Sequence, residues 1–293
     1  MRADRVPELP EVETARRGIA QQLVGRRVTG YELALPKLIV SESGLTLDDV
    51  VGARLNDARR FGKYLLLSFD TLGAVVHLKL SGQLVARGSS IPGFAAGHPV
   101  PAYDAPLPHK STHLRLDFDE DAHLYLTDLR HFARVWLMPH DAVPDFLAGL
   151  KLGPDLLASE FTAKRLAQRL ERRPASKIKP ALLDQAVIAG VGNIYADESL
   201  WQAKLHPERM VGSLSAAEIR RLYQGIVTSI KLALPTGGAR ILHTKAQSDL
   251  GEFPFVHGRE GLPCARCGTT IIKTRVNNRG TYLCPRCQRL PKT

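Results

Sequence analysis

The chain has 293 residues, of which 44% are hydrophobic and 24% charged, so it has the composition of a globular protein long enough for two domains. Its 40 Lys and Arg outnumber its 29 Asp and Glu, and the net charge of +11 favours a polyanionic partner such as nucleic acid, although a solvated basic surface would have the same composition. No apolar run is long enough to span a membrane and the N-terminus lacks the apolar core of a signal peptide, which predicts a soluble, cytoplasmic protein.

The first predicted helix begins in the segment VPELPEVETARRG (6–18). Pro10 and the two glutamates after it suit the first turn of a helix, which we expect over about residues 10–24. The apolar residues of this stretch share one face: Val12, Ala15, Ile19 and Leu23. A helix start alone does not explain why Pro7 and Glu8 precede it.

The remainder of the first half predicts short strands. KYLLLSF (63–69) and AVVHLKL (74–80) are apolar and separated by a turn, whereas HLRLDF (113–118) and HLYLTD (123–128) alternate apolar and polar residues. Several short strands with turn signals between them indicate a sandwich or barrel. The stretch 87–111 is rich in Pro and Gly, and we expect it to be a long surface loop.

The pattern changes at LKLGPDLLAS (150–159), where we place a domain boundary. Downstream, the segment 215–234 begins with Ser215 and Glu218 in capping-box spacing and carries one apolar stripe, so it predicts a helix. KPALLDQAVIAGVGNIYADESLWQAKL (179–205) predicts two helices interrupted by GVGN.

The chain has four cysteines, arranged as C-x2-C-x16-C-x2-C with a strand–turn–strand spacer: Cys264, Cys267, Cys284 and Cys287. Two such pairs predict a tetrahedral zinc site on a β-hairpin, and two disulfides are the alternative, which the lack of an export signal disfavours. Because cysteine fills every ligand position, the zinc is expected to be structural. Arg279 is expected at the tip of this basic hairpin, where it would contact phosphate or remain solvated.

Eight features occur in one order: PELPEVET, FGKYLLL, HLKLSG, TDLRHF, LGPDLL, GVGNIYADESL, HPER and the four-cysteine hairpin. Together they resemble the formamidopyrimidine-DNA glycosylase and endonuclease VIII family of base-excision repair enzymes, from Pro7 to the C-terminus. Leu9 favours the formamidopyrimidine branch, because endonuclease VIII enzymes usually have glycine there.

The resemblance implies a multi-domain α+β fold with an N-terminal helix plus β-sandwich, a helix–two-turn–helix domain and a C-terminal β-hairpin zinc finger. We expect an N-terminal catalytic β-sandwich domain over 7–149, a helix–two-turn–helix DNA-binding domain over 150–256 and the zinc finger over 257–293. Residues 1–6 are expected to be an extension outside these domains.

The resemblance also assigns the catalytic residues. Pro7 would be the nucleophile, whose secondary amine attacks C1′ of the damaged nucleotide and forms a Schiff base that leads to β- and δ-elimination. Glu8 would be the general acid/base, and Lys63 would contact phosphate and assist at the lesion. Without the resemblance, the first two would be helix-start residues and Lys63 an edge-strand lysine.

For DNA binding, the resemblance places His77 near the DNA backbone and an amide of Asn193 on a phosphate. A glycosylase must also fill the gap left by the base that it extrudes. Leu80, which stands where the family usually has methionine, and Phe132 would fill that gap, and Arg130 would face the estranged cytosine. Without the resemblance, His77, Leu80 and Phe132 would be interpreted as packed core residues.

Two departures from the family pattern bear on activity. In a chain that begins with MRADRV, the nitrogen of Pro7 is a tertiary amide with no nucleophilic lone pair; a start at Val6, read as methionine and then removed, would free it, so we expect residues 1–6 to be an over-extended gene prediction. The segment 237–261 is short for the loop that covers an extruded 8-oxoguanine, and His257 replaces a common tyrosine, which leaves the base preference open.

The predicted function is therefore a bifunctional DNA glycosylase and AP lyase that removes oxidised purines, namely 8-oxoguanine and formamidopyrimidines. We expect it to act as a monomer on double-stranded DNA that contains oxidised bases or abasic sites, with one structural zinc ion and no nucleotide cofactor. Two alternatives remain open: a preference for oxidised pyrimidines like that of endonuclease VIII, and a non-catalytic lesion-binding protein in which Pro7 stays blocked.

Overall fold

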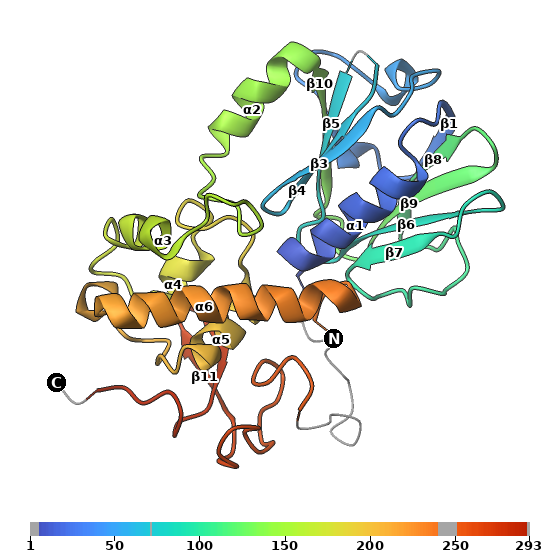
Figure 1. Cartoon of the computed structure of the whole chain (residues 1–293). Helices are drawn as coiled ribbons and strands as arrows, with labels where there is room; N and C mark the ends of the chain where they lie inside the picture. The colour runs from blue at the N-terminus through green and yellow to red at the C-terminus, as the bar shows by residue number, and fades with distance from the viewer. Residues whose placement is uncertain (1–5, 71, 240–250, 292–293) are drawn as a thin grey trace. The chain divides into compact units, whose positions relative to one another are not determined.

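The computed structural model describes residues 6–70, 72–239 and 251–291. The chain divides into two compact units, Met1–Lys151 and Leu152–Thr293 (Figure 1). Residues 1–5 of the predicted N-terminal extension and residues 240–250 of the segment predicted to be a short covering loop lie outside the described residues.

The first unit contains two five-stranded sheets. Its strands are β1 (Val28–Leu33), β2 (Ile39–Val40), β3 (Asp57–Phe61), β4 (Tyr64–Ser68), β5 (Leu72–His77), β6 (Gly82–Gly88), β7 (Phe94–Gly97), β8 (Thr112–Phe118), β9 (Ala122–Asp128) and β10 (Arg134–Pro139). One sheet has the order β1-β8-β9-β6-β7 and the other β2-β10-β5-β4-β3. Only the β2–β10 pair is parallel among the described strands.

The two sheets form a sandwich around one apolar core. Alternate side chains of facing strands are buried there, among them Leu67, Val76, Leu114, Leu126 and Leu137. The unit ends in a short helix, α2 (Val143–Gly149). Its first residue belongs to a second, smaller apolar cluster with Leu66, Val75 and Met138. The sandwich predicted from the alternating strands is confirmed.

The first helix, α1 (Leu9–Gln22), contacts β3 and β7, the edge strands of the two sheets. Its predicted apolar face is buried: Val12, Ala15, Ile19 and Leu23. The close approach to β7 requires glycine at position 18, because a Cβ there would lie 2.4 Å from the ring of Phe94. Helix α1 thus closes one open side of the sandwich, as Figure 1 shows.

The prediction of one long loop over 87–111 is wrong in part, since this stretch contains β7, which pairs with β6. The strand has only four residues, FAAG. Gly93 precedes it and Gly97 is its last residue, and both glycines have positive φ. Glycine and proline therefore mark the turns that flank a short edge strand, rather than the absence of one.

The second unit is helical, with a hairpin at its end. Its helices are α3 (Ala163–Leu170), α4 (Ile178–Leu183), α5 (Asn193–Gln202) and α6 (Ala216–Ala233). The predicted capping box starts α6, because Glu218 N donates to Ser215 Oγ (3.2 Å) and Ser215 N donates to a Glu218 carboxylate oxygen (2.8 Å). Among the described residues, no helix has the length and apolar character that a membrane span requires.

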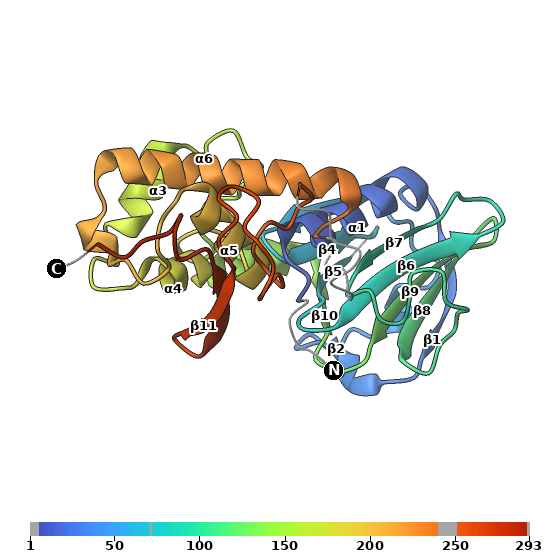
Figure 2. The same ribbon diagram turned by 90° about the horizontal axis from the view of Figure 1, so that it is seen from below.

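The terminal hairpin consists of β11 (Ile272–Val276) and β12 (Arg279–Leu283). Strand β12 packs against α5, and Figure 2 shows the hairpin beside α4 and α5. Asn277 and Asn278, with φ values of 45° and 61°, form its two-residue turn. Arg279 is therefore the first residue of β12, one position after the turn in which it was expected, and it is exposed.

Candidate active site and nucleic-acid interface

Pro7 and Glu8 lie at the start of α1 and are both buried. Glu8 is the residue that caps the helix, and its backbone N donates to Glu11 Oε2 (3.0 Å) while its own carboxylate accepts from the backbone N of Glu11. The reciprocal pair fixes the backbone that follows Pro7. Glu11, one of the two glutamates that suit the first helical turn, therefore ties down the helix start.

Lys63 lies in the two-residue turn between β3 and β4, after Gly62, whose φ is 58°. The shape of this turn depends on Glu13 in α1, a residue that sequence reasoning treated only as a helix-start residue. Glu13 accepts a hydrogen bond from Arg60 Nε (3.0 Å), and Arg60 donates in turn to the carbonyl of Gly62 (3.1 Å). A buried ion pair between helix and strand thus supports the lysine turn.

Burial would raise the pKa of Glu13, but hydrogen bonds from Arg16, Arg17 and Arg60 outweigh it and lower the pKa from 4.5 to about 2. A carboxylate with a lowered pKa stabilises the fold fully above the unfolded value, and this stabilisation is lost as the pH falls from about 4.5 towards 2. We predict that the free energy of unfolding of Glu13→Gln falls less on acidification than that of the wild type, by on the order of 2 kcal/mol after solvent screening. Urea unfolding of both proteins between pH 7 and pH 2.5 measures it; parallel pH profiles would contradict it.

His77 ends β5, and its ring packs edge-on against Tyr64 at 4.5 Å. Burial, reinforced by the nearby Lys79 and Lys63, lowers its pKa to about 3. Its Nδ1 accepts a hydrogen bond from the backbone N of Lys79 (2.8 Å), which fits a neutral ring with the proton on Nε2. At neutral pH, His77 can therefore donate a hydrogen bond to phosphate but contributes no charge.

Leu80, Arg130 and Phe132 lie on two neighbouring loops at one end of the sandwich. The loops meet where Arg130 N donates to the hydroxyl of Ser81 (3.1 Å). Phe132 is 46% exposed, which is unusual for a large apolar side chain, and the Arg130 guanidinium lies 5.3 Å from the centre of its ring. The structure thus places side by side the two loops that carry the three side chains predicted to fill the gap in DNA.

In the second unit, Asn193 is the first residue of α5 and lies beside the terminal hairpin. Its amide nitrogen donates to the carbonyl of Gly280 (3.0 Å), while its buried Oδ1 has no hydrogen-bond partner among the described residues. Asn193 and Arg279, 86 positions apart in sequence, are therefore close neighbours through Gly280.

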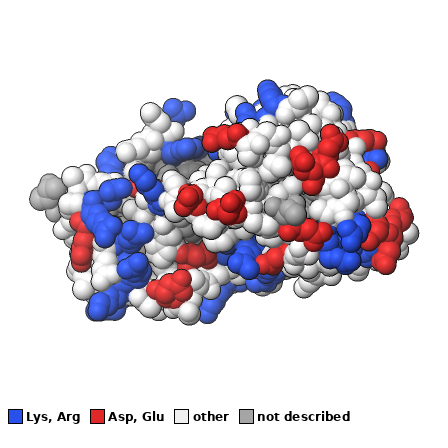
Figure 3. Space-filling view, turned by 90° about the horizontal axis from the view of Figure 1, so that it is seen from above, with Lys and Arg blue, Asp and Glu red and all other residues white. Residues whose placement is uncertain are grey.

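The net positive charge belongs to the second unit. Leu152–Thr293 has 22 Lys and Arg against 11 Asp and Glu, whereas Met1–Lys151 has 18 of each. Figure 3 shows Lys and Arg side chains gathered over the second unit and mixed signs over the sandwich. The second unit therefore supplies the long-range attraction for a polyanion.

A buried polar cluster joins α4, α5 and the hairpin. Lys179 and Asp197, both with fully buried side chains, form an ion pair of 2.7 Å. Lys179 Nζ also donates to Gly280 O (2.9 Å) and Thr281 Oγ1 (2.8 Å). The helix residues and the hairpin residues of this cluster are distant in sequence. The only sequence signal for the cluster is Asp197, an acidic residue in the middle of the helix predicted from GVGNIYADE.

The same cluster extends to the segment before the zinc finger. His257 is buried and bonded through Nδ1 to Asp197 (2.8 Å), so it lies inside the unit. The neighbouring Glu198 accepts from the backbone N–H groups of residues 255, 256 and 257, each at 2.8 Å, and burial raises its pKa. The two adjacent acids thus fix the segment 255–257 to α5, and Asp197 also accepts from the backbone N of Tyr282 on β12 (3.2 Å).

We predict that Lys179→Met lowers the free energy of unfolding of the second unit by about 3–5 kcal/mol, because it leaves the carboxylate of Asp197 buried without its cation. Lys177→Met is the matched control, since its ammonium pairs with Glu208 at the surface and should cost less than about 1 kcal/mol. Urea denaturation of both variants makes the comparison. Equal losses would show that the buried pair has no special role.

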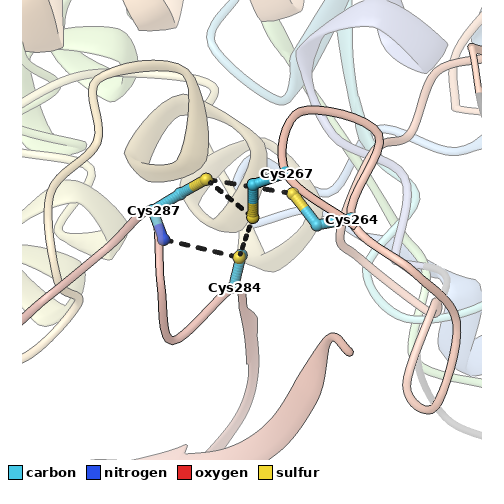
Figure 4. Close-up of side chains that lie close together, drawn as sticks. All are labelled: Cys264, Cys267, Cys284 and Cys287. Atoms are coloured by element: carbon cyan, nitrogen blue, oxygen red, sulfur yellow. Dashed lines mark hydrogen bonds between the residues drawn. The ribbon is translucent and has the colours of Figure 1, made fainter. Parts of the chain in front are cut away.

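The four cysteines lie together at the base of the hairpin, with their sulfurs directed toward a common centre (Figure 4). All four sulfurs lie within 4.8 Å of one another. The separations are 4.0 Å for Cys264–Cys287, 3.5 Å for Cys267–Cys284 and 3.4 Å for Cys267–Cys287. Disulfide sulfurs would be about 2 Å apart, and the cysteines are free.

These separations fit zinc. Four sulfurs at about 2.3 Å from a tetrahedral zinc ion lie about 3.8 Å from one another. Trp201 Nε1 donates to Cys264 Sγ (3.4 Å) and Cys287 N donates to Cys284 Sγ (3.4 Å), which are contacts that stabilise zinc-bound thiolates. The expected single structural zinc is thus supported by the donor set.

Family comparisons cover the whole architecture. The N-terminal domain of formamidopyrimidine-DNA glycosylase matches residues 6–135, its H2TH domain matches 152–245, and the zinc finger found in FPG and IleRS matches 261–290. The zinc finger match confirms the structural zinc, and the three together confirm the predicted fold class.

Full-length relatives give the same result. The chain is 39% identical to the formamidopyrimidine-DNA glycosylase of Pelotomaculum thermopropionicum and 37% identical to that of Latilactobacillus sakei, over 97% of this chain and 100% and 98% of those proteins. A Lactococcus lactis FPG mutant in complex with DNA containing Fapy-dG has a TM-score of 0.83 at 33% identity, and MutM with carbocyclic 8-oxo-G DNA has 0.82 at 32%; each comparison covers 97% of this chain and all of the solved chain. By its sequence, its fold and its zinc finger, this chain belongs to the formamidopyrimidine-DNA glycosylase family.

Proposed function

We propose that the protein removes oxidised purines, namely 8-oxoguanine and formamidopyrimidines, from double-stranded DNA and then cleaves the strand through Pro7. As a member of its family it is a base-excision repair glycosylase with AP lyase activity. The observation that carries the choice of substrate is the full-length match to relatives solved with Fapy-dG and 8-oxo-G DNA. We also propose that it acts as a monomer. Since the relatives are bacterial proteins, we propose the bacterial cytoplasm as its location.

In the proposed reaction, the Pro7 nitrogen forms a bond to C1′ of the damaged nucleotide, and the glycosidic bond breaks with its electron pair leaving on the base. Opening of the sugar ring gives an iminium ion, which makes the C2′ proton acidic, so that loss of this proton expels the 3′ phosphate, and a further elimination expels the 5′ phosphate. An α-amino group has a pKa near 8, so a useful neutral fraction exists at physiological pH. The reaction requires a chain whose first residue is Pro7.

Glu8 is proposed as the general acid/base at the sugar. A carboxyl directly beside the nucleophile can transfer a proton to the sugar oxygen as the ring opens. The capping contacts with Glu11 support this role, because they fix the position of Glu8 relative to the helix start. Lys63, in the turn held by Glu13 and Arg60, is proposed to bind a phosphate beside the lesion.

The two exposed loops of the sandwich are proposed to stabilise the extruded state. Phe132 would insert between bases, Leu80 would fill the gap, and Arg130 would hydrogen-bond the estranged cytosine. In the second unit, Asn193 and Arg279 are proposed to bind DNA phosphates. The shared contact with Gly280 and the net charge of this unit support that assignment.

A matched pair of variants tests the phosphate contacts. Lys63→Gln should lower the slope of log binding constant against log salt concentration by about 1, because one counterion-releasing contact is lost. His77→Gln should leave the slope unchanged at pH 7.5, since the pKa of about 3 keeps the histidine neutral. Fluorescence anisotropy with a lesion analogue between 50 and 300 mM salt measures both slopes, and identical changes would refute the assignment.

Excision assays test the substrate class. The protein that begins at Pro7 should release 8-oxoguanine and formamidopyrimidines faster than thymine glycol, and should prefer 8-oxoguanine opposite cytosine over the other three bases. Faster release of thymine glycol would favour the endonuclease VIII alternative. Lesion binding without any release would favour the non-catalytic alternative.

A further inference from the structure

Asp128, the last residue of β9, directs its carboxylate at both loops that carry the proposed gap-filling side chains. It is 1% exposed. Its Oδ1 accepts from Arg130 N (3.0 Å) and from the hydroxyl of Ser81, and its Oδ2 accepts from Phe132 N and Ala133 N, both at 2.7 Å. One buried carboxylate therefore satisfies four donors from two loops.

Ser81 completes this link. Its hydroxyl donates to Asp128 and at the same time accepts from Arg130 N, and it directly follows Leu80 in the chain. The side chain is 2% exposed, so water cannot readily replace these contacts. The positions of Leu80, Arg130 and Phe132 are thus coupled through two buried polar side chains.

Both loops contain a backbone conformation that L-residues rarely adopt. Lys79, just before Leu80, has a φ of 54°, and His131, between Arg130 and Phe132, has a φ of 58°. The His131 ring packs edge-on against His113 at 4.6 Å, and His113 Nε2 is bonded to the carbonyl of Asp128 (2.6 Å). The unfavourable turns persist because the contacts around Asp128 specify them.

We propose that Asp128, together with Ser81, is a positioning residue that sets Leu80, Arg130 and Phe132 in their DNA-filling arrangement before DNA binds. Fixing the loops in advance removes an ordering cost that binding would otherwise incur, and it aims the Arg130 side chain at one position. The proposal rests on the proposed function, because it assigns significance to the roles of those three residues in DNA.

The test uses the protein that begins at Pro7 and measures 8-oxoguanine excision opposite cytosine and opposite adenine. Rates are normalised to the fraction of molecules that borohydride traps on abasic-site DNA. Asp128→Asn replaces one carboxylate oxygen by an amide NH2 group, a donor that must then face backbone N–H groups or the Ser81 hydroxyl. This variant should reduce the rate of excision opposite cytosine about 10- to 100-fold. The cytosine-to-adenine rate ratio should also fall, by about tenfold, toward the ratio of Arg130→Ala.

The rate ratio separates positioning from folding, because a loss of folded protein changes both rates equally. Asp117→Asn is the matched control: this carboxylate lies on β8 and bonds to Arg115 and His123, away from both loops, so the ratio should stay at the wild-type value. If Asp128→Asn does not fold, Ser81→Ala decides, with an expected fall in the ratio of about threefold from the loss of one shared hydroxyl.

The inference is overturned if Arg130→Ala changes the cytosine-to-adenine rate ratio but folded Asp128→Asn leaves it unchanged. If Asp128→Asn does not fold, an unchanged ratio in Ser81→Ala overturns it in the same way. If Arg130→Ala itself leaves the ratio unchanged, the proposed role of Arg130 fails first, and the positioning role fails with it. The two failures are therefore distinguishable in one experiment.

Discussion

The protein that begins at Pro7 should cleave DNA at 8-oxoguanine, whereas the chain that begins at Met1 should bind the same DNA without cleaving it. The reason is the nitrogen of Pro7, which is a secondary amine in the first protein and a tertiary amide in the second. Loss of the nucleophile should reduce cleavage on the order of 10³-fold or more. Gel assays of strand cleavage and of binding, with intact masses verified for both proteins, make the measurement.

Two variants of the shorter protein serve as controls. Pro7→Gly keeps a free terminus, but as a primary amine of different basicity and position it should lose most of the activity. Glu8→Gln should lose base release yet retain cleavage at pre-formed abasic sites, because its general acid is needed for the first step. Full cleavage by an intact chain that starts at Met1 would contradict the assignment of Pro7.

Cys284→Ser should release the zinc ion and unfold the terminal hairpin, because a structural zinc site supplies folding free energy directly, about 10 kcal/mol or more. Arg279 and the carbonyl of Gly280 lie on this hairpin, so DNA affinity should fall at least about tenfold. Metal content by atomic emission and binding by anisotropy measure the two effects. Trp201 fluorescence should change as well, since its indole contacts Cys264.

The matched control for the zinc variant is Arg286→Gln, which changes an exposed residue between the last two cysteines and removes no ligand. It should retain zinc and lose at most the affinity of one phosphate contact. The sandwich of the first unit should keep its thermal transition in both variants. Unimpaired DNA binding by a zinc-free Cys284→Ser protein would contradict the proposed role of the finger.

The sequence predicted the helices and strands whose residue spacing shows which side chains are buried or where the element begins. The apolar face of α1, the alternation in β8 and β9 and the capping box of α6 follow directly from residue spacing. The four-residue β7 was missed, because its flanking glycines resemble loop sequence and its partner β6 is identified only by tertiary pairing.

The supporting contacts of the site could not be predicted, because their partners are distant in sequence. Lys179, Asp197 and Thr281 form one buried cluster, yet each residue alone resembles a surface residue. Asp128 was visible within TDLRHF, but its bonds to Ser81 and to the backbone of the next loop require the three-dimensional structure. Buried polar groups must find partners, and the fold determines which ones.

The most direct test of the central claim is to trap the covalent intermediate and identify the attached residue. Borohydride reduces an iminium ion to a stable amine, so the protein that begins at Pro7 should become joined to DNA containing 8-oxoguanine or an abasic site. Proteolysis and mass spectrometry of the conjugate should then find the DNA remnant on the nitrogen of Pro7. A remnant on Lys63, or on any other residue of an active protein, would contradict the account.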